Sequence, residues 1–445
     1  MQGPLTGAVA PRARSFWIHT LGCPKNEVDS QKLAGRLRAG GLEAAEKPGE
    51  ADLIVVNTCA FIEAARAESI ETIIELSDLR RDGARLAVTG CLAERNGEEL
   101  AEALPEVDLV AGFGAELTPA LAAAPVAFLR RQELPDFDLL ELPRPPASAP
   151  WAYVKVAEGC DRRCGFCVIP SFRGPQRSRA LASVLEEVDR LDVSEVVLVA
   201  QDLASYGGDR SSASRLEHDR ILDLVGAVAA RVDWVRLLYL YPSSLTDELV
   251  DAVVATGVPY FDLSLQHVSR PLLRRMRRFG ERGRITERIG RIRSVAPEAA
   301  LRSSFILGYP GETEQDHDEL LSFIEEAELD WAGFFTFSRE AGTYADGLTE
   351  ELQVPEALAL ERLAECSELQ DAITARRRAS LVGAELTVLV DGDGRGRTYR
   401  EAPEIDGIVR LAGAGAGAAP GSFVTARCVG SEGPDLLAEV EGGRP

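Results

Sequence analysis

The chain has 445 residues, of which 45% are hydrophobic and 27% charged, so it has an ordinary globular composition but is too long for one hydrophobic core. Two or three domains are therefore expected. Residues Met1 to Arg14 lack the apolar stretch of an export signal, and no apolar run is long enough to span a bilayer. These features predict a cytosolic protein with no membrane partner, in which cysteines stay reduced and serve as ligands or nucleophiles.

The formal net charge of −22 bears on the choice of partner. Nucleic-acid binding depends on Lys and Arg side chains that neutralise phosphates, so an acidic chain is disfavoured for that role. A basic protein or a small molecule fits this charge better. A local basic patch can still override the total charge.

The first region, from Ser15 to about Gly114, alternates short apolar runs with helical patterns, which predicts βαβ units and a parallel sheet. We place this domain at residues 14–118. A composition shift with prolines crowded at its end then predicts a linker over 119–149, because proline fixes φ and removes a hydrogen-bond donor. The expected strands of the first domain are Phe16–Ile18, Leu53–Val56 and Leu86–Val88.

The second region resumes the alternation for six units, which predicts a partial βα barrel rather than a complete eight-unit one. A long amphipathic helix is expected over 355–380, and the domain is placed at 150–382. The last region, 383–445, has short strands broken by Gly-rich turns and predicts a small all-β barrel. The fold class is thus α/β with an all-β end domain. The expected barrel strands are Tyr153–Val156, Glu195–Val199, Trp234–Leu238, Tyr260–Leu265, Leu301–Leu307 and Trp331–Phe337; those of the end domain are Glu385–Val390, Ile408–Leu411, Ser422–Val429 and Leu437–Val440.

Three cysteines form a C-x3-C-x2-C loop directly after the first strand of the partial barrel: Cys160, Cys164 and Cys167. Three thiolates can hold three irons of a 4Fe–4S cluster and leave the fourth iron open. An open iron can bind the amine and carboxylate of S-adenosylmethionine, ready for reductive cleavage to a radical. The alternatives are a structural zinc loop or a chance grouping, but zinc needs four ligands and no fourth Cys or His follows nearby.

A second group of three cysteines, Cys23, Cys59 and Cys91, is spaced about one βα unit apart, each at the end of an apolar run. Because the carboxyl ends of parallel strands meet at one edge of the sheet, these cysteines are expected to converge. Three thiolates again indicate a cluster with one exchangeable iron; the alternative is three buried core cysteines. Cys366 and Cys428 have no partner at ligand spacing and are interpreted as packing residues.

Residues 160–174, CDRRCGFCVIPSFRG, resemble the cluster loop of the radical S-adenosylmethionine methylthiotransferase family. The resemblance covers nearly the whole chain. It implies an N-terminal cluster domain, a radical barrel and a C-terminal TRAM barrel. It also implies two 4Fe–4S clusters, one on each cysteine group, with S-adenosylmethionine as cofactor.

Two branches of this family differ in substrate, and residues 21–30, LGCPKNEVDS, are similar to the ribosomal-protein branch. The tRNA branch usually has Gln-Met in place of Pro24-Lys25 and Val-Arg in place of Phe61-Ile62, and residues 401–407 also resemble the first branch. The implied reaction is methylthiolation of the β-carbon of an aspartate in small-subunit ribosomal protein twelve. Two S-adenosylmethionine molecules are used, one to methylate sulfur and one to form the radical.

Charge supports the ribosomal-protein branch, since residues from Glu385 onward include ten acidic and six basic residues. Such a domain repels RNA phosphates and attracts a basic protein. The alternatives are a tRNA adenosine methylthiotransferase, for which tRNA replaces the ribosomal protein as partner, and a non-catalytic iron–sulfur scaffold. The radical chemistry also requires an electron-donor protein.

Further cofactor contacts are predicted at Phe166, Gln201 and Gly308, while no side chain is assigned a catalytic role. Phe166 lies inside the cluster loop, and Gln201 and Gly308 end the second and fifth barrel strands, on the active face of such barrels. A packing role for Phe166 and a simple turn at Gly308 are the alternatives. Ten arginines between Arg270 and Arg293 are interpreted as a solvated helical face, with a polyanion contact as the alternative.

Overall fold

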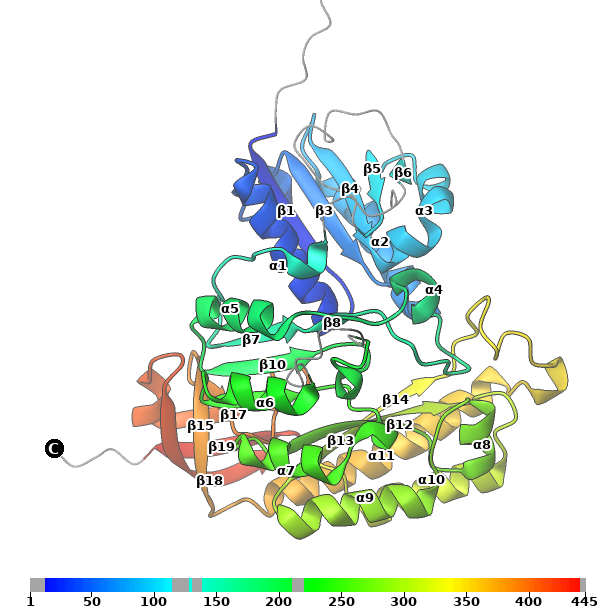
Figure 1. Cartoon of the computed structure of the whole chain (residues 1–445), viewed down its shortest axis with the longest axis vertical. Helices are drawn as coiled ribbons and strands as arrows, with labels where there is room; N and C mark the ends of the chain where they lie inside the picture. The colour runs from blue at the N-terminus through cyan, green and yellow to red at the C-terminus, as the bar shows by residue number, and fades with distance from the viewer. Residues whose placement is uncertain (1–12, 114–127, 130–137, 210–219, 441–445) are drawn as a thin grey trace, which may run out of the picture. The chain divides into compact units, whose positions relative to one another are not determined.

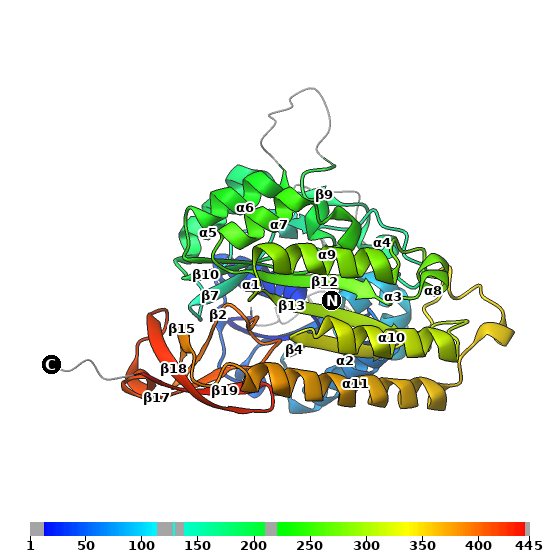
Figure 2. The same cartoon turned by 90° about the horizontal axis from the view of Figure 1, so that it is seen from below.

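The computed structural model describes residues 13–113, 128–129, 138–209 and 220–440 (Figures 1 and 2). The chain divides into two compact units, residues 1–145 and 146–445. In the part of the chain that the structure describes, no helix is long and apolar enough to cross a membrane.

The first unit is built on a six-stranded parallel sheet of order β2-β1-β3-β4-β5-β6. Its central strand β3 is buried along its whole length. A strand buried on both faces needs apolar side chains at every position, and this explains the continuous apolar run Leu53–Val56. The predicted parallel sheet is thereby confirmed. The elements are β1 (Ser15–Thr20), α1 (Pro24–Ala39), β2 (Glu43–Ala44), β3 (Leu53–Thr58), α2 (Glu63–Leu79), β4 (Arg85–Gly90), α3 (Cys91–Ala103), β5 (Leu109–Ala111) and β6 (Phe128–Leu129).

The described part of the predicted linker belongs to the first unit as far as Pro145. Strand β6 adds to the sheet beside β5, and a short 3-10 helix (Leu139–Glu141) lies against α1. The buried ammonium of Lys32 donates to the carbonyl of Leu140, and Arg144 donates to Gln31 at 2.6 Å. The domain limits at 118 and 149 stay a prediction, and residues 114–127 and 130–137 lie outside the described residues.

The second unit contains the predicted six-stranded partial barrel. Sheets β11-β10-β7 and β12-β13-β14 are parallel throughout, and a parallel bridge between Leu240 and Leu263 joins them. Helices α6, α7 and α9 lie side by side along the strands (Figure 2). The strands are β7 (Trp151–Lys155), β10 (Glu195–Val199), β11 (Trp234–Leu237), β12 (Tyr260–Gln266), β13 (Ala300–Leu307) and β14 (Trp331–Thr336). The main helices are α5 (Leu181–Leu191), α6 (Ile221–Ala229), α7 (Asp247–Ala255), α9 (Arg282–Val295), α10 (Glu314–Ala327) and α11 (Glu356–Ala379).

The end of the second unit is a closed five-stranded barrel of order β15-β16-β17-β19-β18. The sequence predicted four of these strands and missed β16, because Arg-Gly-Arg has no apolar alternation. Gly396 and Arg397 of β16 are nonetheless buried. The strands are β15 (Glu385–Gly392), β16 (Arg395–Arg397), β17 (Val409–Gly413), β18 (Phe423–Glu432) and β19 (Asp435–Val440).

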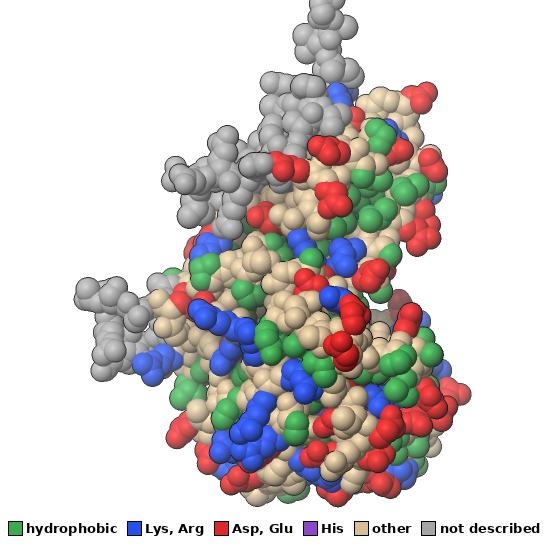
Figure 3. All heavy atoms as spheres, turned by 90° about the vertical axis from the view of Figure 1, so that its right-hand side faces the viewer, with side chains coloured by type: hydrophobic (Ala, Val, Ile, Leu, Met, Phe, Trp, Pro, Cys, Tyr) green, Lys and Arg blue, Asp and Glu red, His purple; other side chains and the backbone are tan. Residues whose placement is uncertain are grey.

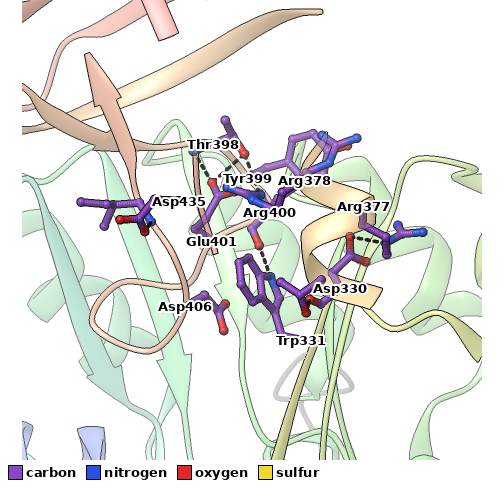
Figure 4. A network of polar contacts seen from close by, with 12 residues as sticks. Asp330, Trp331, Arg377, Arg378, Thr398, Tyr399, Arg400, Glu401, Asp406 and Asp435 are labelled. Carbon is purple, nitrogen blue, oxygen red and sulfur yellow. Dashed lines mark hydrogen bonds and ion pairs between the residues drawn. The ribbon is translucent and has the colours of Figure 1, made fainter. Parts of the chain in front are cut away.

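The end barrel is held to the βα barrel by buried polar contacts (Figure 4). The indole of Trp331 donates to the carbonyl of Arg400 at 2.7 Å, and Arg378 pairs with the fully buried Glu401. Asp406 accepts from the hydroxyl of Tyr260 at 2.6 Å. The segment 398–406 therefore acts as an internal connector between the two barrels.

A second connection runs through Glu195, whose carboxylate lies between two buried guanidinium groups. Arg236 of β11 donates to it at 2.8 Å, and Arg397 of β16 pairs with its other oxygen. Burial alone raises the pKa of Glu195, but the charges of Arg397 and Arg236 outweigh it and hold the pKa below its ordinary value.

Replacing Glu195 by glutamine is expected to destabilise the second unit by about 3–5 kcal/mol, because two buried cations lose their counter-charge. The native pKa of Glu195 is lowered, so this contribution is present above the ordinary carboxyl pKa and disappears as the pH falls through the native value. The deficit should therefore shrink in acid. Glu186→Gln, at an exposed pair with Arg190, is the matched control and should cost under about 1 kcal/mol. Urea unfolding is followed by fluorescence of Trp151, Trp234 and Trp331; equal midpoints for both variants would contradict this account.

Candidate iron–sulfur cluster sites

The three-cysteine loop of the second unit follows β7 and is tied at several points to its surroundings. The amide of Cys160 donates to the carbonyl of Gly174 at 3.0 Å. The amide of Gly165 donates to Met276 at 2.7 Å, and its carbonyl accepts from Ala345 at 2.8 Å. A Cβ at position 165 would meet the hydroxyl of Tyr309 at 2.9 Å, so glycine allows this close packing. The structure thus holds the loop by its backbone and leaves the thiols for other contacts.

The thiols of this loop lie in a partly buried setting. Burial, followed by the nearby Asp202 carboxylate, raises the pKa of Cys160 to about 11. Burial, followed by the neighbouring thiols, raises the pKa of Cys167 to about 12. Thiolates therefore form here only when positive charge is supplied, as iron ions do on binding.

The described residues contain no group of three or more His, Cys, Asp or Glu side chains arranged around one ion position. A single metal ion is thus not indicated by the described side chains. A 4Fe–4S cluster needs no such convergence, because each of its thiolate ligands binds a different iron. The donor set of three cysteines on one fixed loop fits that cofactor.

Two arginines that the sequence reasoning did not single out contact the thiols, Arg162 from within the loop and Arg278 from outside it. Arg278 donates to the sulfur of Cys164 at 3.4 Å, and the backbone amide of Arg162 donates to the sulfur of Cys160 at 3.4 Å. Both guanidinium groups lie 4.0 Å from the ring centroid of Tyr241. These donors favour thiolate over thiol. Arg278 was hidden in the sequence within a run of ten arginines, where spacing alone gives no signal.

Polar side chains that follow β10 lie beside the loop, and Gln201, a predicted cofactor contact, is one of them. Its amide donates to Glu158 at 3.0 Å, while Asp202 accepts from Arg162 at 2.6 Å. Two oxygens here, the single side-chain oxygen Oε1 of Gln201 and Oδ1 of Asp202, are buried with no partner among the described residues. Buried acceptors without partners carry a free-energy cost that a bound donor removes. They suit the ammonium group of an amino-acid ligand such as S-adenosylmethionine.

The other two predicted cofactor contacts are placed differently. Phe166 is half-buried and packs against the core of the barrel. Gly308 has φ +73°, its amide donates to the carboxylate of Glu312, and a Cβ there would lie 2.5 Å from that of Ala359 in α11. Helix packing therefore already accounts for the glycine, and contacts of both residues with a cofactor stay predictions.

In the first unit, the loops that carry Cys23, Cys59 and Cys91 converge on one buried side chain, Asn26. Its amide donates to the carbonyls of Leu21 at 2.9 Å and Thr58 at 3.1 Å. Its carbonyl oxygen lies 3.7 Å from the sulfur of Cys91. Asn26 thus joins the ends of β1, β3 and β4, a role that its place in the Cys23–Ser30 motif did not reveal.

Two glycines allow these strand ends to approach one another. Gly22 has φ +94°, and a Cβ there would lie 2.9 Å from the sulfur of Cys59. Gly90 has φ +92°, and its Cβ would lie 2.3 Å from the side-chain oxygen of Asn57. Any larger residue would push the three cysteine loops apart. Cys366 and Cys428, in contrast, are buried in α11 and β18, as a packing role requires.

Comparison with known families gives three matches along the chain. Residues 15–112 match the family described as uncharacterized protein family UPF0004, residues 154–324 the Radical SAM superfamily, and residues 382–440 the TRAM domain. A solved radical S-adenosylmethionine methyltransferase, TsrM from Kitasatospora setae, shares the fold with a TM-score of 0.50 and 16% identity, over 75% of this chain and 77% of its own. The fold and the cluster loop define a radical S-adenosylmethionine enzyme with two 4Fe–4S clusters.

Curated relatives specify the family more closely. The ribosomal protein uS12 methylthiotransferase RimO of Streptomyces coelicolor is 41% identical, over 98% of this chain and 98% of that protein. The RimO proteins of Geobacter sulfurreducens and Moorella thermoacetica are 41% and 42% identical, over 95% and 92% of this chain and 97% and 95% of their own lengths. The chain belongs to the RimO family of radical S-adenosylmethionine methylthiotransferases.

Proposed function

We propose that this protein transfers a methylthio group to ribosomal protein uS12, with the β-carbon of an aspartate as acceptor, and that it does so in the cytoplasm. The observation that carries the proposal is the near full-length similarity to RimO proteins, which are described as uS12 methylthiotransferases. The two three-cysteine sites support it, because each leaves one iron of a 4Fe–4S cluster without a protein ligand.

The two cysteine sites have separate tasks in this proposal. When bound, the clusters supply reductive cleavage of S-adenosylmethionine at one site and an attachment point for the transferred sulfur at the other. Cys160, Cys164 and Cys167 would hold the first cluster, and Cys23, Cys59 and Cys91 the second. Gln201 and Asp202 would orient the methionine part of S-adenosylmethionine through their partnerless buried oxygens.

The surface charge of the end barrel supports the proposal that the substrate is a basic protein. Two of its basic residues, Arg397 and Arg400, are buried against the βα barrel and paired with carboxylates, so they add no positive charge to the surface. Exposed acids such as Glu385, Glu404 and Glu439 remain. The surface of the described part of this barrel is therefore rich in negative charge, which attracts a basic ribosomal protein and repels RNA.

Replacing Gln201 by leucine is expected to weaken S-adenosylmethionine binding about tenfold, because the variant loses a buried acceptor for a charged donor, worth about 1.5 kcal/mol. Equilibrium dialysis with labelled S-adenosylmethionine on the reconstituted protein measures this affinity. The iron content should equal that of the wild type, since no cluster ligand is changed. If the variant bound S-adenosylmethionine as tightly as the wild type and kept its full iron content, Gln201 would not contact the cofactor.

A substrate competition tests the proposed function itself. Anaerobically reconstituted protein receives S-adenosylmethionine, sulfide and reductant together with small ribosomal subunits and bulk tRNA, and mass spectrometry locates any methylthio group. We expect a gain on uS12 and none on tRNA. If tRNA were modified and uS12 were not, the radical chemistry would stand but the substrate would be tRNA. The argument from the acidic end barrel would then be overturned.

A further inference from the structure

The ten arginines between Arg270 and Arg293 fall into two groups in the structure, where the sequence suggested one solvated face. Six of them contact carbonyl, hydroxyl, thiol or carboxylate groups of neighbouring elements and so fix α8 (Arg270–Arg275), α9 and the segment between them: Arg275, Arg278, Arg282, Arg288, Arg291 and Arg293. The other four, Arg270, Arg274, Arg277 and Arg284, are exposed.

These four arginines, with Phe279 and Tyr344, form a surface that we call the basic patch. Glu281 lies 3.3 Å from Arg270 and 3.6 Å from Arg284, and Arg284 lies over the ring of Phe279 at 5.0 Å. Arg277 lies over the ring of Tyr344 at 3.9 Å. Both aromatic residues are unusually exposed to solvent, Phe279 at 52% and Tyr344 at 40% of their surface. Figure 3 shows basic side chains beside hydrophobic ones at the lower left of this face, at about the height of α8.

The basic patch is the outer surface of the segments that hold the Cys160–Cys167 loop. Arg278, between two patch residues, donates to the sulfur of Cys164 at 3.4 Å. Met276, which precedes Arg277, and Ala345, which follows Tyr344, form hydrogen bonds with the backbone of Gly165 at 2.7 and 2.8 Å. A Cβ at Gly165 would lie 3.1 Å from the ring of Tyr344. Any protein docked on the patch is thus separated from the loop by about one layer of side chains.

We propose that the basic patch docks an acidic one-electron carrier protein, which reduces the cluster held by Cys160, Cys164 and Cys167. This inference rests on the ligand set of the proposed function. One electron leaves the reduced carrier and enters the cluster, so the carrier is oxidised by one electron, the cluster is reduced by one, and no bond changes. Small interfaces with charged rims and an apolar centre are typical of transient electron-transfer encounters. The patch has this composition.

The charge of the chain and of the basic patch favours an acidic carrier protein over a basic ribosomal protein or RNA. The chain carries −22 overall and repels an acidic carrier, so a local positive surface is needed to steer that carrier to the cluster. A basic ribosomal protein is repelled by the same surface. Single-stranded RNA could pair with the arginines and stack on the rings, but its binding would gain nothing from a position over the cluster loop, whereas electron transfer requires it.

The test is a triple charge reversal, Arg270→Glu, Arg274→Glu and Arg284→Glu, in the reconstituted full chain. Rapid mixing with a reduced, acidic plant-type 2Fe–2S ferredoxin, followed by EPR of frozen samples, gives the rate of cluster reduction. We expect that rate to fall at least about tenfold at low salt and to lose its dependence on ionic strength. Iron content and reduction by dithionite, which needs no docking surface, should match the wild type.

The matched control is Arg190→Glu, an exposed arginine on α5 outside the patch, which should leave the ferredoxin rate unchanged. An unchanged rate in the triple variant at full iron content would overturn the proposal. The proposal would also be overturned if poly(U) RNA bound the wild type but not the triple variant, while both proteins were reduced by ferredoxin at the same rate. If the triple variant loses iron, Phe279→Ser replaces it, with the same expected loss of rate. A cluster that persists in Cys164→Ala would instead refute the ligand set.

Discussion

Cys164→Ala is expected to lose about half of the bound iron and all reductive cleavage of S-adenosylmethionine. Two remaining thiolates cannot anchor the three irons that the loop is proposed to hold. The surrounding fold should persist, because the loop is fixed by backbone bonds from Gly165 to Met276 and Ala345 rather than by the thiol. Iron analysis, EPR of the reduced protein and chromatography for 5′-deoxyadenosine measure the three effects.

The matched control for this variant is Cys428→Ala in the end barrel, where the thiol is buried and serves packing. It should cost about 1 kcal/mol of stability and leave iron and 5′-deoxyadenosine formation unchanged. Full iron content in Cys164→Ala, or a loss of iron in Cys428→Ala, would show that the two groups of cysteines have been assigned wrongly.

Cys59→Ala should separate radical formation from methylthio transfer. The variant is expected to keep 5′-deoxyadenosine formation near the wild-type level while methylthiolation of uS12 falls below detection, because the second cluster would lose one of its three anchors. About half of the iron should again be lost. Mass spectrometry of uS12 together with 5′-deoxyadenosine analysis on the same samples measures both activities.

Cys366→Ala in α11 is the control for this second variant, since Cys366 is fully buried and at no ligand spacing. It should support both activities at full iron content. If Cys59→Ala also stopped radical formation, the two sites would not act separately. If it still modified uS12, the Cys23, Cys59 and Cys91 group would have no part in sulfur transfer.

The cysteine sites show how far sequence reasoning reaches. Cys160, Cys164 and Cys167 lie within eight residues, so one loop brings them together whatever the rest of the fold does. Cys23, Cys59 and Cys91 are far apart, but each follows a strand of a parallel sheet, and the edge geometry of such a sheet predicts their convergence. The contacts of Asn26 with all three strand ends bear this out.

Where the pattern of apolar residues carried no information, the predictions fell short. Strand β16 was missed because its buried arginine, Arg397, is held by ion pairs with Glu195 and Asp391 rather than by hydrophobic contact. At Gly308 nothing in the sequence indicated the close approach of Ala359, which by itself requires a glycine, and the predicted cofactor contact stays a prediction. Both cases depend on a partner that lies far away in the sequence.

By itself, the sequence determined the fold class, the two groups of cysteines and the family, because these depend on periodicity and on local spacing. Only the tertiary structure decided which charged side chains are buried, which arginines lie at the cluster loop and which remain exposed. Arg278 and Cys164 are 114 residues apart, and their contact arises from the way the segment between α8 and α9 packs on the loop. The run of arginines in the sequence does not reveal this contact. Each arginine differs from the next only in its neighbours, and those neighbours come from other elements of the fold.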